Sequence, residues 1–279
     1  MVSTAPAEIR LDDDILFSDF MLKWLEVTKS TVQITTYASY QGMVERVIVP
    51  YFRKRNIKLV DLKATDLQDF YNKQLERVKA NSVIHYHANI HKALKYAVKI
   101  DLIPTNPADK VERPKKNEFK GSYYSADEIH ALTEITEGTK LEIPVLLASF
   151  YGLRRSEVLG LKWDSINFAM QTLTIRHTVA RVTKVVEKNK TKNASSFRSF
   201  PLTDDAVRLF KILLQQEQYY RNHYGKDYID NDYVFTWEDG HPYSPDYVSH
   251  TFHKLLKKYD LPHIRFHDLR HTCASMLLS

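Results

Sequence analysis

Apolar residues recur every three or four positions through most of the first hundred residues. The first run is Phe17, Phe20, Met21, Trp24 and Leu25. Three further runs keep this spacing: Tyr37 to Ile48, a segment that opens at Thr65, and a segment that Ser82 caps and that continues to Val98. This periodicity predicts amphipathic helices, and four of them are enough for a compact bundle. Residues 11–108 are therefore predicted to form a helical domain.

A proline-rich, basic stretch follows this bundle. The segment from Ile103 to Pro107 interrupts the helical pattern, and residues 109–124 combine proline and positive charge with few apolar positions. This composition is typical of a linker between domains. Its cations could follow a phosphate backbone, although charged linkers are commonly only solvated. The candidate DNA contacts here are Arg113, Lys115, Lys116 and Lys120.

The helical pattern resumes in a second domain, predicted to span residues 125–279. Ser125 and Glu128 have the spacing of a capping box. A further apolar helix leads to a turn at Gly152, and a short helix capped by Ser156 follows it. Later helices are predicted at 204–221, at 245–258 with Ser244 as the cap, and from Asp268 to the last residue.

Three segments in the middle of this domain have strand character. Residues 172–179 alternate between apolar and polar positions, residues 182–186 can pair with them, and residues 199–202 are a third candidate. The predicted fold class is therefore multidomain α and α+β: a helical bundle followed by a mainly helical domain with a small antiparallel sheet.

Composition narrows the class of protein. No apolar stretch approaches the roughly 20 residues that a membrane span needs, and the N-terminus lacks the pattern of a secretory signal. The one cysteine, Cys273, cannot form an internal disulfide, which favours a cytoplasmic protein. The formal charge of +6 favours a polyanionic partner, and a generically basic surface is the alternative.

Two short motifs suit the binding of a phosphate. Gly152 precedes Arg154 and Arg155 at the start of a helix, where guanidinium groups and helix amides favour anions, and Glu157 can form a salt bridge with one arginine. His267 and Arg270 lie three positions apart at the mouth of the last helix, so an imidazole and a guanidinium can share a face.

A predicted hairpin from Lys184 to Phe200 is the third candidate. Such a basic hairpin could enter a DNA groove and deliver one lysine as a general acid. Its cations are Lys184, Lys188, Lys190, Lys192 and Arg198. Each of these three segments could instead be ordinary solvated surface. Composition alone does not show which lysine of the hairpin would act as the acid.

Together these motifs resemble the tyrosine recombinase (phage-type integrase) family. The matching elements, in order, are Gly152-Leu-Arg154-x-x-Glu157, a lysine hairpin that closes on Pro201-Leu202, and His267-x-Leu-Arg270-His271-Thr272. The order and spacing agree over nearly the whole chain. The helical first domain resembles that family's core-binding domain.

The resemblance implies strand cleavage by a tyrosine through a 3′-phosphotyrosyl link, without metal or nucleotide cofactor. Arg154 and Arg270 would hold the phosphate, His267 would assist proton transfer, and Lys190, with Lys192 in reserve, would protonate the leaving oxygen. Glu157 would support the site, and His271 is expected to pack or cap.

The family's nucleophilic tyrosine lies downstream of the second arginine, and residues 271–279 contain no tyrosine. The expectation is therefore a chain truncated before its nucleophile. The resemblance further implies that double-stranded DNA at a recombination site lies between the domains, that the complete protein is a tetramer on synapsed DNA, and that the protein is the integrase of a mobile element located at the nucleoid.

Two alternatives stay open. A DNA-binding or architectural protein could keep the fold without cleaving, and the absent tyrosine favours this hypothesis. A metal-dependent nuclease could use His85, His87 and His91, of which the last two are four positions apart, but matching carboxylates are not evident.

Overall fold

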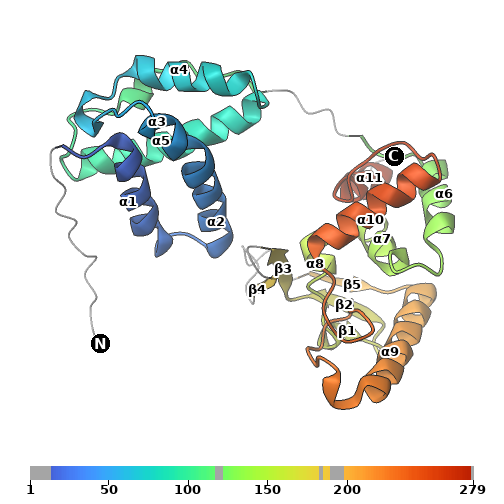
Figure 1. Ribbon diagram of the computed structural model, residues 1–279. Helices are drawn as coiled ribbons and strands as arrows, with labels where there is room; N and C mark the ends of the chain where they lie inside the picture. The colour runs from blue at the N-terminus through green and yellow to red at the C-terminus, as the bar shows by residue number, and fades with distance from the viewer. Residues whose placement is uncertain (1–13, 117–121, 182–184, 189–197, 278–279) are drawn as a thin grey trace. The chain divides into compact units, whose positions relative to one another are not determined.

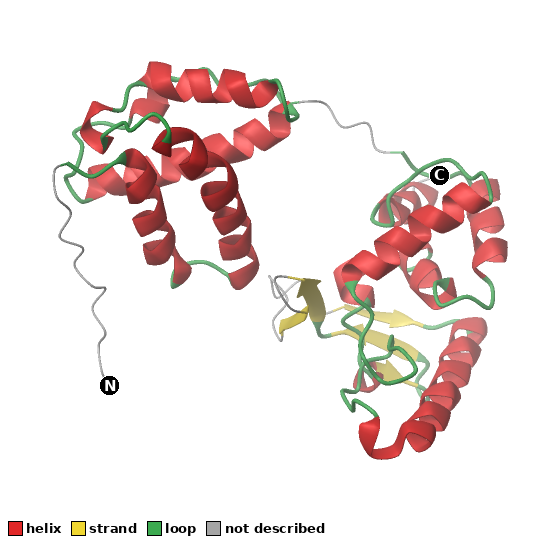
Figure 2. Ribbon diagram, in the orientation of Figure 1, coloured by secondary structure: helices red, strands yellow, loops and turns green. Residues whose placement is uncertain are grey.

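In the computed structural model the chain divides into two compact units, Met1–Phe119 and Lys120–Ser279, here called the N-terminal and C-terminal units (Figure 1). The described residues are 14–116, 122–181, 185–188 and 198–277. The N-terminal unit is helical, and the strands belong to the C-terminal unit, as Figure 2 shows. This agrees with the predicted fold class. No described helix is long and apolar enough to cross a membrane.

The N-terminal unit packs its helices around an aromatic core. Its α-helices are α1 (Phe17–Lys29), α2 (Ile34–Met43), α3 (Val49–Arg53), α4 (Ala64–Leu75) and α5 (Ala80–Lys99), with 3₁₀ turns at Leu59–Asp61 and Pro107–Lys110. The ring of Phe52 meets Phe17 edge-on at 4.8 Å and lies 5.3 Å from Phe70. The first periodic run is buried as predicted, from Phe17 to Leu25.

A π-helical turn at Val44–Ile48 joins α2 to α3, so the predicted helix over Tyr37 to Ile48 continues past its expected end. Pro50 follows the turn and has no amide hydrogen to donate to the preceding turn of helix. The widened turn accommodates the proline without ending the helical path.

The predicted Ser82 cap is wrong, and the helix start predicted at Thr65 is one residue late. Helix α5 begins at Ala80, and Ser82 lies inside its first turn, where its amide donates to the Lys79 carbonyl at 2.9 Å. Helix α4 begins at Ala64 rather than Thr65 because the Asp66 carboxylate accepts the Lys63 amide at 2.9 Å. In α4 the capping group is thus a side chain inside the helix, whereas Lys79, the N-cap of α5, makes no side-chain capping hydrogen bond.

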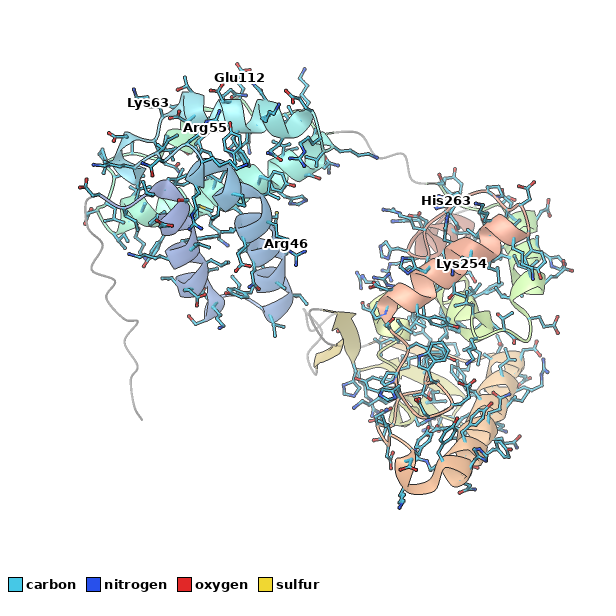
Figure 3. The ribbon with its side chains drawn as sticks, in the orientation of Figure 1. Arg46, Arg55, Lys63, Glu112, Lys254 and His263 are labelled. Atoms are coloured by element: carbon cyan, nitrogen blue, oxygen red, sulfur yellow. The ribbon has the colours of Figure 1, made fainter. Side chains whose placement is uncertain are left out.

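The segment after α5 packs on the helices of the N-terminal unit. Asn106 caps the turn Pro107–Lys110, and the Glu112 amide donates to the Gln68 side chain of α4 at 3.0 Å. Figure 3 labels Glu112 on this unit. On the other side of residues 117–121, the Tyr124 amide donates to the Thr272 hydroxyl at 3.1 Å within the C-terminal unit.

Helices surround the sheet of the C-terminal unit. They are α6 (Ala126–Thr136), α7 (Glu142–Ser149), α8 (Arg155–Val158), α9 (Asp204–Tyr224), α10 (Pro245–Lys258) and α11 (Asp268–Met276), with 3₁₀ turns at Trp163–Ser165 and Gly225–Asp227. The capping box of Ser125 and Glu128 is present, and the Ser244 hydroxyl caps α10 as predicted. The hydrophobic core lies between these helices and the sheet, with Leu173 and Phe210 fully buried.

The predicted strand over residues 172–179 is two strands. Strand β2 (Thr172–Ile175) pairs with β1 (Ile166–Asn167) and β5 (Arg198–Pro201), whereas β3 (Thr178–Arg181) pairs with β4 (Val185–Lys188), all antiparallel. The chain passes close to Gly160 at the break, because a Cβ on that glycine would lie 2.7 Å from the His177 carbonyl oxygen. The break therefore depends on a long-range contact that alternation does not report.

A buried histidine links α4 to α5. The Tyr71 hydroxyl lies 3.0 Å from His87 Nδ1, and both residues are buried. Burial lowers the pKa of His87 to about 4, and the neighbouring His91 and Arg113 add to the effect. The folded N-terminal unit therefore holds His87 neutral at pH values where the unfolded chain binds a proton.

This difference makes the stability of the N-terminal unit pH-dependent. Because the folded pKa of His87 is below its ordinary value, stability should be constant above about pH 6.5 and decrease toward pH 4, by about 2 kcal/mol at pH 4.8. Urea unfolding monitored by pulsed hydrogen exchange in α4 and α5 measures this loss. His87→Gln keeps a neutral acceptor and should remove most of the loss, whereas His130→Gln in the C-terminal unit should not. An equal loss in the His87→Gln variant would contradict the assignment.

Candidate phosphate-binding site

The site is built on a tight turn that precedes α8. Gly152 has a φ of +62°, a left-handed conformation that glycine adopts without strain. The turn leads from α7 into α8, and Arg154 is the N-cap residue. The predicted cap at Ser156 is wrong: the Glu157 carboxylate reaches back and accepts the Arg154 amide at 2.8 Å. The same carboxylate is thereby fixed under the turn.

Glu157 is the centre of a cluster of arginines. Its side chain is only 3% exposed, yet it accepts from Arg154 Nη1 at 2.6 Å and from Arg198 Nη2 at 3.0 Å. Arg270 Nη1 lies 3.9 Å from the same carboxylate. Three guanidinium groups from α8, β5 and α11 therefore converge on one buried anion.

Arg270 and its neighbour Cys273 on α11 contact the backbone around the Gly152 turn. Its Nη1 donates to the Gly152 carbonyl, and the Cys273 thiol donates to the Phe150 carbonyl at 3.4 Å. Burial lowers the pKa of Arg270, as do the charges of Arg154 and Arg198, while Glu157 acts in the opposite direction. A half-buried cation beside two others attracts an anion strongly.

The loop before α11 positions His267. Asp268 is buried and accepts from Arg265 Nε at 2.9 Å, from its Nη2 at 2.6 Å and from its backbone amide at 2.8 Å. Burial alone would raise the pKa of Asp268, but these bonds hold it below its ordinary value. The pKa of His267 is lowered, first by burial and then by the charges of His271 and Arg265. His267 is therefore neutral near pH 7 and can take up or donate a proton.

A cleft of about 700 Å³ lies beside Arg154 and α10. His267 also lines it, and α10 contributes Ser249, Phe252 and His253. A convergence of guanidinium and imidazole groups on an open cleft is suited to a phosphate diester, since these groups can donate several hydrogen bonds to its oxygens.

The structure brings together four of the predicted site residues, namely Arg154, Glu157, His267 and Arg270. Arg198 was predicted only as a DNA contact, but it shares the Glu157 carboxylate. The sequence signal for this was weak: Arg198 begins the strand that leads to Pro201. His271 was expected to pack or cap, but it is exposed and meets the His267 ring edge-on at 5.6 Å.

Other predicted contacts lie elsewhere. Lys184, Lys190, Lys192 and Lys120 fall outside the described residues, and for Lys188 the structure describes the backbone of β4 alone. Arg113, Lys115 and Lys116 are exposed at the end of the N-terminal unit. The hairpin lysines and these cations stay predictions.

The histidines of the metal hypothesis have other partners. His87 bonds to Tyr71, and His91 Nε2 lies 2.7 Å from the Asp109 carboxylate. Among the described residues, no three metal-binding side chains come close enough to hold an ion. Since His87 is buried against Tyr71, the pair of histidines on α5 is part of the packing of the N-terminal unit.

Comparison with protein families identifies both units. Residues 123–279 match the phage integrase family, and residues 16–75 match the N-terminal SAM-like domain of phage integrases. A tyrosine recombinase XerC-like protein of Caldanaerobacter subterraneus subsp. tengcongensis is 29% identical over 95% of this chain and 72% of its own length. The ICEBs1 integrase of Bacillus subtilis is 24% identical over 87% of this chain and 66% of its own length.

Solved structures share the fold. The Tn1549 transposon integrase in complex with a circular intermediate DNA has a TM-score of 0.78 at 15% identity and covers 95% of this chain and 87% of that one. A lambda integrase tetramer bound to a Holliday junction has a TM-score of 0.69 at 18% identity and covers 99% of this chain and 78% of that one. These likenesses confirm the predicted mainly helical fold with its small sheet.

Removing the charge of Glu157 should destabilise the C-terminal unit. In Glu157→Gln the three partly exposed guanidinium groups lose a charged neighbour that accepts hydrogen bonds from two of them, and we expect the free energy of unfolding to decrease by about 2 kcal/mol. Urea unfolding followed by Trp163 and Trp237 fluorescence measures this change. Glu134→Gln is the matched control, because Glu134 is exposed on α6 and should change stability by less than about 0.5 kcal/mol. Equal effects of the two variants would argue against a central role for Glu157.

Proposed function

The chain belongs to the phage integrase family, and from that premise we propose that it is a site-specific DNA recombinase that cleaves and rejoins strands through a 3′-phosphotyrosyl link. The observation that carries the proposal is the convergence of Arg154, Arg198 and Arg270 on the buried Glu157. Arg154 of this cluster lines the cleft together with His267, so a cation and a proton-transfer group face the same space.

The proposed chemistry assigns one task to each group. Arg154 and Arg270 hold the two non-bridging oxygens of the scissile phosphate and stabilise the charge that develops as a nucleophile adds. His267 assists proton transfer at the attacking or leaving oxygen. Lys190 donates the proton that the leaving 5′-oxygen takes up when its bond to phosphorus breaks, with Lys192 as the second choice. Glu157 positions the arginines and does not touch the DNA.

The nucleophile in this proposal is a tyrosine hydroxyl, which forms a bond to phosphorus as the 5′-oxygen leaves. Residues 271–279 contain no tyrosine, and we assign the role to no residue of this sequence. The proposal requires no metal or nucleotide cofactor, because the phosphotyrosyl link conserves the energy of the broken phosphodiester bond.

The proposed partner is double-stranded DNA at a recombination site of a mobile element. Relatives named as integrases of a prophage and of ICEBs1 support the mobile-element source. The lambda integrase tetramer on a Holliday junction supports assembly of four copies on synapsed DNA. Such a protein acts where the chromosome is, in the nucleoid region of the cytoplasm.

Trapping on a nicked suicide DNA substrate tests the proposal. Residues 1–279 are compared with the product of the complete reading frame of the source gene, on substrates from the ends of the mobile element that carries it. We expect the product of the reading frame to form a covalent adduct on denaturing gels, and Arg270→Ala to reduce that adduct at least about a hundredfold by removing stabilisation of the transition state. Arg208→Ala, an exposed arginine of α9, is the control and should leave it unchanged.

If Arg270→Ala left the adduct at the level of Arg208→Ala, the proposed role of the arginine cluster would be wrong. If both proteins bound DNA and neither formed an adduct, the non-cleaving architectural function would replace the proposal.

A further inference from the structure

The part of the cleft beyond Arg154 has its own cationic lining. Arg155 follows Arg154 in the chain but turns toward α10, where its Nη1 donates to the Ser249 hydroxyl. His253 lies one helical turn after Ser249 on the same cleft. The ring of His253 meets the ring of His263 edge-on at a centroid distance of 5.0 Å. Figure 3 labels His263 beside α10.

Arg155 differs from its neighbour in lacking an acidic partner. Arg154 is paired with Glu157, whereas no carboxylate of the described residues forms an ion pair with Arg155. Burial lowers the pKa of Arg155. A half-buried guanidinium whose partner is a neutral hydroxyl has unused donors and an unbalanced charge, both of which an anion would satisfy.

We propose that Arg155, His253 and His263 form a second phosphate subsite, which holds a phosphate of the same DNA strand next to the scissile one. This inference rests on the proposed function, since the scissile phosphate is placed at Arg154 and Arg270. The cleft of about 700 Å³ is continuous from Arg154 to His263, so one strand can follow it and occupy both positions. The subsite would position the strand and take no part in bond breaking.

The histidine pair adds hydrogen-bond donors to the subsite. An imidazole ring can donate an N–H to a phosphate oxygen, and both rings line the same cleft as Arg155. The described charged groups that line the same cleft are Arg154, Arg155, Asp246, Arg265 and His267. Arg265 is paired with Asp268 and Arg154 with Glu157, and Asp246 is the acid of the cleft lining, so Arg155 is the lining arginine without an ion-pair partner among the described residues.

The salt dependence of DNA binding tests the subsite without knowledge of the recombination site. The probe is a 30-base-pair duplex of mixed sequence, and its dissociation constant is measured by fluorescence anisotropy at several salt concentrations and pH 7.5. Loss of one phosphate contact decreases the slope of log K against log salt by about 0.9. We expect this change in Arg155→Gln, and hence about eightfold weaker binding at 0.1 M salt. Arg155→Lys should retain the slope of the unaltered chain.

Arg208→Gln is the matched control, because this exposed arginine of α9 does not line the cleft. His253→Phe combined with His263→Phe removes the imidazole donors and should weaken binding at pH 7.5, whereas His130→Phe, at an exposed position of α6, should not.

An unchanged slope in Arg155→Gln would overturn the subsite, as would a slope change of the same size in Arg208→Gln. Neither result bears on the covalent adduct of the proposed function. Conversely, if no adduct formed but Arg155→Gln lowered the slope, the subsite would stand as a DNA contact while the cleavage function failed.

Discussion

The C-terminal unit depends on one buried carboxylate. Glu157 is almost inaccessible to solvent, and an isolated charge in that position would be expensive to bury. Attraction to three arginines compensates for the desolvation of Glu157, and Glu157 in turn reduces the repulsion among the arginines. Each such interaction is worth about 4 kcal/mol at 4 Å in a medium typical of protein surfaces before desolvation is counted. The left-handed Gly152 turn, the start of α8 and the packing of α11 all bring groups to this carboxylate and its arginines.

The charge balance of the cluster favours one kind of ligand. One carboxylate against three guanidinium groups leaves two positive charges unbalanced. A phosphodiester carries one negative charge, and the pentacoordinate state of its displacement carries two. In the proposed reaction the cluster would therefore complement the charge of the transition state better than that of the bound diester, which is the condition under which binding energy accelerates a reaction. If Glu157 were neutral, the cluster would carry three unbalanced positive charges. This excess would be present both in the unbound site and with the diester bound.

Local patterns predicted much of this protein. The Ser125 and Ser244 caps, the buried run from Phe17 to Leu25 and the salt bridge of Glu157 with Arg154 all depend on residues a few positions apart. Two features that the sequence did not predict depend on contacts between residues far apart in the sequence. Arg198 joins Glu157 from 41 positions away, and the strand break after Ile175 follows from contact with Gly160. Ser156 seemed the better cap by propensity, but a carboxylate three residues after Arg154 binds its amide and two guanidinium groups together.

Arg154 and Arg155 are neighbours in the chain, but their side chains have different partners. Arg154 is the N-cap residue, and its side chain turns back to Glu157. Arg155 is the first helical residue, and successive side chains diverge by about 100° around a helix, so it reaches α10 instead. Among the described residues Glu157 forms no ion pair with Arg155. Under the proposed function, Arg154 would share Glu157 with two other arginines at the scissile phosphate, whereas Arg155 would contact the next phosphate of the strand without an acidic partner.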